Sequence, residues 1–246
     1  FKQKTAYEIT TRLVGSVHGW GDITEGFTLQ YTWYVPHDVA GHIDRVGRRL
    51  YETRLDSLFV TELPDDIPGA HDIQGRIGAY WHGNEPCHNI VYLYNYLGQP
   101  WKCQQWVRRI SDAFYGNEPG SLSGNDDCGQ MSAWYIFSVM GFYPVCPGSG
   151  EYVLGAPYLP YLKVSLPNGR TLEIRAEGVD DGHRYVREMK VNGERWTKNY
   201  VTVDDIMQGG VWEFRMSSTP DRRRGTKPEA RPYSLTDGLD DAPETK

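Results

Sequence analysis

The chain has 246 residues, of which 39% are hydrophobic and 24% are charged, enough apolar material for one large domain or two small ones. Its formal net charge is -6 and its basic residues form no stripe, which excludes a nucleic-acid or anionic-membrane surface. The longest apolar runs, 91–97 and 133–139, are far shorter than the ~20 residues of a membrane span. The chain begins at Phe1 without a signal region, so any targeting signal is expected to lie outside it.

Residues 1–145 are predicted to be mainly helical, because apolar residues recur there at helical spacing between polar loops. Asp38 can cap the first of these helices, since its side chain can accept a hydrogen bond from an unpaired amide of the first turn. The predicted helices cover 38–47, 48–59, 89–97, 100–114 and 130–140. Helical hairpins at this spacing favour an α/α toroid over a parallel-sheet enzyme.

After residue 145 the apolar pattern changes to period two, which predicts about five strands of an antiparallel β-sheet or sandwich over 146–219. Asn168 and Gly169 lie between two alternating segments and predict a type I′ hairpin turn, because both residues tolerate positive φ. From 220 to 246 there is no apolar period. This last segment is predicted to be a surface or disordered tail.

Three polar loops flanked by glycine lie between predicted helices, where a helical scaffold exposes reactive groups. They are Gly-Asp-Ile-Thr-Glu-Gly at 21–26, His-Gly-Asn-Glu-Pro at 82–86 and Gly-Asn-Asp-Asp-Cys-Gly-Gln at 124–130. One such loop alone is weak evidence, since these residues are also ordinary in turns and caps. A second Gly-Asn-Glu-Pro at 116–119 is interpreted as a turn. The 8 Trp and 17 Tyr fit a saccharide cleft or an aromatic-rich core.

Together with the residues that follow them, these loops resemble glycoside hydrolase family 92. The motifs are TEGFTLQYTW at 24–33, GNEP at 83–86, YLYNYLGQPW at 92–101, GNDD at 124–127 and GQMSAWY at 129–135. The resemblance implies an exo-acting α-mannosidase that inverts the anomeric centre and uses calcium. It also implies an amino-terminal β-sandwich domain outside this chain. Residues 1–145 are then expected to form the second half of an (α/α)6 catalytic barrel.

Glycoside cleavage passes through an oxocarbenium-like state and needs a carboxylic acid for the leaving oxygen and a carboxylate that activates water or attacks. Glu25 is the candidate acid, because flanking Trp20 and Phe27 would desolvate it and raise its pKa. Asp127 is the candidate base. Asn125 can hold the water or a hydroxyl by hydrogen bonds.

The same loops carry the candidate ligands for Ca2+, which accepts about six to eight flexible oxygen ligands and could hold two hydroxyls of a distorted mannoside. These candidate metal ligands are Asn84, Glu85 and Asp127. The candidate sugar contacts are Trp20, His37, Asp38, His82, Glu85 and Asp126. The four cysteines form no CxxC pair, so zinc is not expected.

The sequence therefore predicts hydrolysis of terminal α-linked mannose, with α-1,2 the expected linkage, from N-glycans or mannans outside the cytoplasm. Two alternatives stay open. The chain could be a carbohydrate-binding piece without turnover, because half a barrel need not hold Glu25 and Asp127 in register. It could also belong to another (α/α)6 glycosidase, such as a trehalase or glucoamylase, which would not need calcium.

Overall fold

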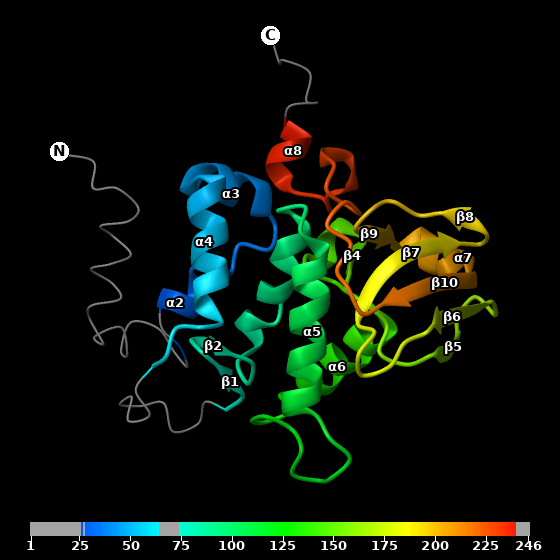
Figure 1. The fold of residues 1–246 in the computed structure, drawn as a ribbon, viewed down its shortest axis with the longest axis horizontal. Coiled ribbons are helices and arrows are strands. Elements are labelled where there is room, and N and C mark those ends of the chain that lie inside the picture. Colours follow the sequence, from blue (N-terminus) through cyan, green and yellow to red (C-terminus); the bar gives the residue numbers. More distant parts are fainter. Residues whose placement is uncertain (1–25, 27, 64–73, 240–246) are drawn as a thin grey trace, which may run out of the picture.

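The computed structural model describes residue 26, residues 28–63 and residues 74–239. Most of the helices lie in one half of the molecule and the larger sheet lies in the other (Figure 1). The α-helices are α2 (Thr28–Tyr31), α3 (Val39–Val46), α4 (Arg48–Leu58), α5 (Pro100–Phe114), α6 (Gln130–Met140), α7 (Val203–Gln208) and α8 (Leu235–Leu239). None of the helices in these described residues is long and apolar enough to cross a membrane.

The remaining elements are short 3-10 helices and strands. The 3-10 helices are η2 (Glu85–Cys87), η3 (Ile90–Asn95), η4 (Pro147–Ser149) and η5 (Pro228–Ala230). The strands are β1 (Arg76–Ile77), β2 (Tyr80–Trp81), β3 (Phe142–Tyr143), β4 (Glu151–Leu154), β5 (Tyr161–Ser165), β6 (Thr171–Glu177), β7 (Tyr185–Val191), β8 (Glu194–Arg195), β9 (Tyr200–Thr202) and β10 (Gly210–Ser217). The order of mainly helical and then mainly β segments agrees with the prediction from the sequence, whereas the toroid itself stays a prediction.

The helical half packs around a core rich in aromatic rings. Trp81, Tyr92 and Trp134 are wholly buried there, together with aliphatic residues of α4 and α5. Trp106 stacks on Phe59, with ring centroids 4.2 Å apart. A large share of the aromatic composition therefore serves this core, which is one of the two roles that the sequence allows.

The predicted helix over 89–97 is buried, but it is wound as the 3-10 helix η3. All six of its residues are buried, so its side chains do not divide into an inner and an outer face. Hydrophobic periodicity cannot fix the winding of such a segment, and its packing against α5 decides it.

The larger sheet has the strand order β5-β6-β10-β7-β8. Its neighbours pair in antiparallel fashion except for β6 and β10, which are parallel. The sheet is therefore mixed, and the prediction of an antiparallel region is only partly correct. The reason is that β10 inserts between β6 and β7 after a long excursion through β8, β9 and α7, so its direction is not set by a hairpin.

The two Asn-Gly pairs form different turns. Gly169 has φ 81° and Asn168 does not have positive φ, while Leu166 N donates to Arg170 O over 2.9 Å. This is a three-residue hairpin loop rather than the predicted type I′ turn. The sequence pair Asn192-Gly193, between β7 and β8, has positive φ at both residues (52° and 87°), as a type I′ turn requires.

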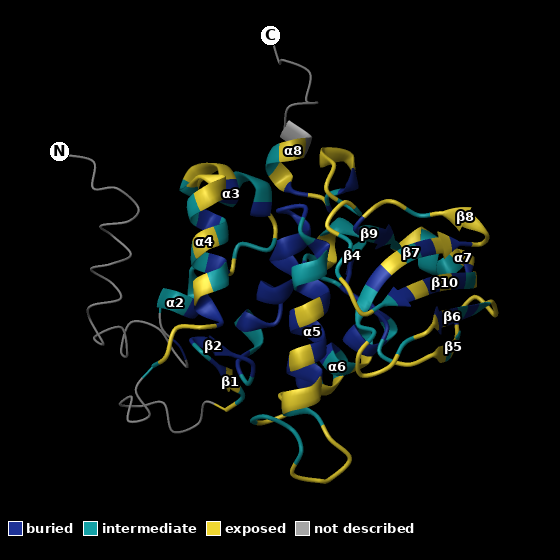
Figure 2. Ribbon diagram, in the orientation of Figure 1, coloured by how far each residue is buried: buried dark blue, intermediate teal, exposed yellow. Residues whose placement is uncertain are grey.

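Residues 220–239 run along the surface from β10 back to the helical half. Asn199 N donates to Ala230 O over 2.7 Å, and Leu235 N donates to His37 O over 3.0 Å. The helix α8 consequently lies beside α3, at the opposite end of the sequence (Figure 1). In Figure 2 this path is mainly exposed or intermediate. Ala230 and Ser234, which lie at its attachment points, are buried. The sequence of this segment has no apolar period, and polar contacts hold the segment in place.

Candidate active site

The described residues of the three polar loops lie close to one another. A Cβ built on Gly26 would lie 3.5 Å from Asn84 Nδ2. A Cβ built on Gly83 would lie 3.0 Å from Ser123 O, and one built on Gly124 would lie 3.5 Å from Gly83 O. Glycine is needed at Gly83 because a side chain would collide with this neighbouring backbone. The fold thus gathers segments that are far apart in the sequence.

A glutamine amide links the second and third loops. Gln130 Nε2 lies 3.2 Å from His88 Nδ1 and donates to Tyr143 Oη over 3.0 Å. His88 Nε2 lies 3.0 Å from His82 O, a group that can only accept, so His88 carries its proton on Nε2 and accepts from Gln130 on Nδ1. Burial lowers the pKa of His88 to about 4, although its bond to His82 opposes this, so the ring is neutral at neutral pH.

The structure places His82 in the interior, whereas the sequence predicts that it contacts the sugar. Its side chain is wholly buried, and its Nδ1 and Nε2 lie 2.8 Å from Tyr80 Oη and 2.7 Å from Tyr115 Oη. Tyr115 gives its own hydroxyl hydrogen to Met131 O, so it accepts from His82 Nε2. Both ring nitrogens are therefore in use, and burial, with a smaller effect of His88, lowers the pKa of His82 well below its usual value. His82 positions the loops rather than facing a ligand.

The third loop has an unusual backbone. Asp127 (φ 46°) and Cys128 (φ 59°) are consecutive non-glycine residues with positive φ, and Gly124 and Gly129 flank them with φ of 87° and 92°. Side chains are uncommon in this region of φ, and such strained conformations cluster at active sites and ligand clamps. The helix α6 begins directly after this loop.

The two adjacent acids of this loop point to different partners. Asp126 Oδ1 accepts from Ser132 N over 3.0 Å and from Ser132 Oγ over 2.8 Å, so this carboxylate serves the first turn of α6. Asp127 is exposed, and its carboxylate makes no hydrogen bond or ion pair with the described residues. Asn125 is exposed beside it. Of the two acids, Asp127 has no carboxylate oxygen in a hydrogen bond or ion pair with the described residues, whereas Oδ1 of Asp126 is bound to Ser132.

Asn84 and Glu85 begin η2 at the centre of the three loops. Asn84 is 4% exposed and Glu85 is half-buried, so little water competes for their oxygen atoms. The pKa of Tyr143 is raised to about 12 mainly by burial, while Gln130 opposes this rise and the charge of Glu85 adds to it. Within residues 28–63 and 74–239, no three or more His, Cys, Asp or Glu side chains are arranged so that they could hold a metal ion. The donors that fit a hard cation here are amide and carboxylate oxygens.

Two further predicted sugar contacts lie by the carboxyl-terminal segment. Asp38 caps α3 as predicted, with Oδ1 accepting from Gly41 N over 3.2 Å, and it also accepts from Ser234 and Thr236. The His37 side chain is exposed, while its carbonyl accepts from Leu235 N. The carboxylate of Asp38 is thus occupied by contacts within the chain. Trp20 and Glu25 lie outside the described residues.

A comparison with known protein families identifies the family to which these loops belong. The model described as the glycosyl hydrolase family 92 catalytic domain matches residues 2–218. The chain belongs to glycosyl hydrolase family 92. This family assignment removes the alternative of another (α/α)6 glycosidase.

Solved family 92 structures share the fold of this chain. One is a family GH92 α-mannosidase from Bacteroides thetaiotaomicron in complex with mannoimidazole, which is 59% identical with a TM-score of 0.86 and 89% of this chain covered. Another is described as an inverting mannosidase of the same organism, 38% identical with a TM-score of 0.76 and 87% of this chain covered. A secreted glycosidase of Arthroderma benhamiae, described as uncharacterized, is 26% identical over 211 residues, 84% of this chain.

These relatives are much longer than the family 92 chain described here. The chain covers 29% and 30% of the two bacterial structures and 25% of the fungal glycosidase. The chain therefore spans less than a third of the length of each of these relatives.

Several positioning residues are not evident from the sequence. Tyr80, Tyr115, Gln130 and Tyr143 hold the two buried histidines and join the loops through hydrogen bonds. Gln130 was recognisable as part of a motif, but its partners lie 42 and 13 residues away along the chain. Only a three-dimensional structure brings such partners together.

Proposed function

We propose that this chain is the carboxyl-terminal part of an exo-acting, inverting α-mannosidase that removes terminal α-linked mannose with the help of calcium. The observation that carries the proposal is the convergence of the three family motifs. The motifs meet where Gly26 lies close to Asn84 and where Gly83 lies close to Gly124. They are also joined by the contact between Gln130 and His88. The similarity to family 92 α-mannosidases supports the substrate class, since both similar bacterial structures are described as mannosidases.

In this proposal Asp127 activates the attacking water. Its carboxylate is exposed, has no partner among the described residues, and lies on a loop held in the left-handed region by the flanking glycines. Asn125 orients the water or a hydroxyl through its amide. Asp126 acts indirectly by fixing the loop to α6 through Ser132. Glu25 protonates the leaving oxygen as general acid, which completes the pair that glycoside hydrolysis needs.

Asn84, Glu85 and Asp127 are the proposed calcium ligands from this chain. Their amide and carboxylate oxygens are the donors that Ca2+ prefers, and Asn84 and Glu85 are shielded from water. When bound, the ion would supply positive charge that holds two neighbouring sugar hydroxyls. The close approach of Gly83 to Ser123 and Gly124 supports this proposal, because it places the loop that carries Asn84 and Glu85 next to the loop that carries Asp127.

The proposed substrates are N-glycans or related mannans, with an α-1,2 linkage, at a site outside the cytoplasm. The fungal relative described as a secreted glycosidase supports this location. A retained alternative is that this chain binds mannosides without turning them over, because it covers only 29% of the similar bacterial α-mannosidase.

Titration calorimetry with α-1,2-mannobiose in calcium, run beside a rate assay on the same preparation, tests the proposal. Hydrolysis that yields mannose supports the enzyme. Binding without hydrolysis, both for this chain and for the complete polypeptide that carries it, would favour the binding module instead. Neither binding nor hydrolysis of any α-mannoside by the complete polypeptide would contradict both.

A further inference from the structure

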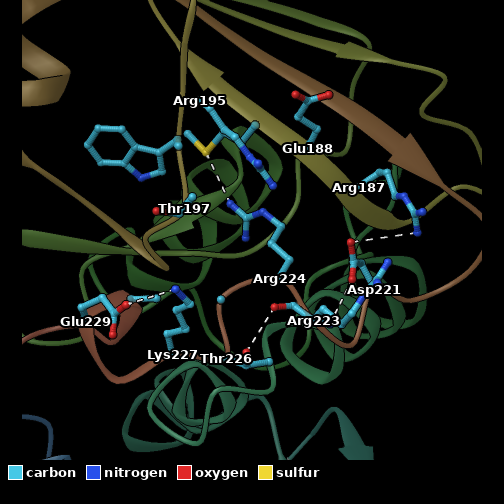
Figure 3. Close-up of a pocket in the computed structure, with 14 residues that line it drawn as sticks. Arg187, Glu188, Arg195, Thr197, Asp221, Arg223, Arg224, Thr226, Lys227 and Glu229 are labelled. Carbon is cyan, nitrogen blue, oxygen red and sulfur yellow. Dashed lines mark hydrogen bonds and ion pairs between the residues drawn. The ribbon is translucent and has the colours of Figure 1, made fainter.

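A cavity that includes no residue of the three loops lies between strands β7 and β8 and the segment that follows β10. Its volume is about 430 Å3, and its walls carry five basic and three acidic residues. Figure 3 shows the side chains of Arg195 and Arg224 reaching into the same space from opposite walls. The cavity therefore carries an excess of positive charge.

The three carboxylates of the cavity already have other cationic partners. Asp221 pairs with Arg187 at 4.0 Å and Glu229 pairs with Lys227 at 3.7 Å. Glu188 pairs with Arg215 at 3.4 Å, outside the cavity wall. Each acidic residue of the cavity therefore pairs with a cation other than Arg195 and Arg224.

The guanidinium groups of three arginines of the cavity, Arg195, Arg223 and Arg224, have no carboxylate contact among the described residues, and two of them form the proposed site. Arg224 Nη2 reaches only Met189 Sδ, a weak acceptor, at 3.9 Å. Arg195 is exposed on β8 and makes no side-chain hydrogen bond or ion pair there. Burial lowers the pKa of Arg224 to about 10, with Asp221 opposing this effect and the positive charge of Arg195 adding to it. Both groups remain cationic at neutral pH, and they repel each other across the cavity.

An aromatic ring also lines this cavity. Trp196 follows Arg195 in the sequence, lines the same cavity, and has its Nε1 fixed to Tyr200 O over 2.9 Å. Its indole is thus held in one orientation. Flat indole rings pack against the C–H faces of sugars, whereas paired guanidinium groups bind oxyanions through several hydrogen bonds.

We propose that Arg195, Arg224 and Trp196 form a binding site for a sugar that carries an oxyanion, either a phosphate or a carboxylate group. The oxyanion lies between the two guanidinium groups and relieves their repulsion. The sugar ring lies against Trp196. This site is independent of the proposed mannosidase centre, so it can be tested whether or not that proposal holds.

The experiment is titration calorimetry of the full chain with glucose 6-phosphate, glucuronate, inorganic phosphate and glucose, in calcium-free buffer. Both acidic sugars are expected to bind, more tightly than inorganic phosphate, with affinity that falls as salt is added. Glucose is expected not to bind. Binding of inorganic phosphate as tight as that of the acidic sugars would overturn the role of Trp196. Absence of binding by both acidic sugars would overturn the site.

Variants locate the binding. Arg224→Gln and Arg195→Gln are each expected to weaken binding about tenfold or more, because each removes charge-assisted hydrogen bonds to the oxyanion. Arg195 is exposed on a short strand, so its variant stays informative if Arg224→Gln fails to fold. Arg222→Gln is the matched control, because Arg222 is an exposed arginine two residues before Arg224 that does not line the cavity. Equal loss in the control, or no loss in Arg195→Gln, would overturn the proposal.

Discussion

Thr236 Oγ1 donates a hydrogen bond of 2.6 Å to Asp38 Oδ2, across 198 positions of the sequence. The other carboxylate oxygen of Asp38 accepts from Gly41 N, Ser234 Oγ and Thr236 N, at distances from 2.8 to 3.2 Å. One side chain therefore caps α3 and holds the carboxyl-terminal segment against it.

Asp38→Ala is expected to lower the free energy of unfolding by about 2 kcal/mol, since a helix cap and hydrogen bonds to a charged group are lost together. Denaturant titration measures this. Asp44→Ala is the control, because Asp44 is an exposed residue of the same helix. A difference between the two variants below about 0.5 kcal/mol would show that Asp38 does not hold the two segments.

The pH dependence of this contribution has a defined window. Burial alone would raise the pKa of Asp38, but the hydrogen bonds from Thr236, Ser234 and Gly41 lower it from 3.8 to about 2. A lowered carboxyl pKa stabilises the fold at pH values above the unfolded pKa. The contribution of Asp38 is therefore complete above about pH 3.8 and is lost as the pH falls toward 2.

His82 and His88 predict a second window at higher pH. Both rings are neutral in the fold, and burial lowers the pKa of His88 from 6.5 to about 4. As the pH falls, the unfolded chain binds protons before the folded chain does, because its histidines have the higher pKa. The free energy of unfolding therefore rises as the pH goes from about 4 to 6.5, by about 1.4 kcal/mol per pH unit for each proton. Urea titrations across this range measure the slope. His88→Gln is expected to reduce it and His37→Gln, an exposed control, to leave it. An unchanged slope in His88→Gln contradicts the prediction.

Asp127→Asn is expected to reduce mannoside hydrolysis by about 10²- to 10⁴-fold in the complete polypeptide, the usual contribution of one general acid or base. Asp126→Asn is expected to cost far less activity, because that carboxylate bonds to Ser132 and holds the start of α6. Steady-state rates, with circular dichroism as a check of folding, separate the two residues. More than about a tenth of the activity remaining in Asp127→Asn would remove this residue from the mechanism.

Treatment with a chelator is expected to abolish hydrolysis, and added calcium, but not zinc, is expected to restore it. The two Gly-Asn-Glu-Pro segments provide a matched pair of variants. Glu85→Gln is expected to raise the calcium concentration needed for half-maximal activity at least tenfold, whereas Glu118→Gln, in an exposed turn, leaves it unchanged. Full activity in the presence of chelator would eliminate the metal from the proposal.

The first product is expected to be β-mannose, which NMR of the anomeric protons during the reaction detects. A base that activates water must stand about 6.5 to 9.5 Å from the acid, whereas a direct nucleophile stands about 5 to 5.5 Å away. This range is the expected distance between the carboxyl groups of Asp127 and Glu25 in the complete enzyme. α-Mannose as the first product would overturn the role of Asp127 as a base.

Several features of the structure could be predicted from the sequence, because they depend on local contacts. Asp38 as a helix cap, the helices that lead to Gly47 and Gly141, and the hairpin around Gly169 depend on contacts within a few residues. The family motifs were readable for the same reason, since each is a continuous run of residues that needs no knowledge of its neighbours in space.

The tertiary structure alone decided which of these residues face each other. Burial on every side, rather than periodicity, made η3 a 3-10 helix, and the parallel pairing of β6 with β10 depends on where the chain returns after α7. His82 became a packed residue because Tyr80 and Tyr115 reach both of its ring nitrogens. Such choices depend on contacts between residues distant in the sequence, whose free energies no local pattern encodes.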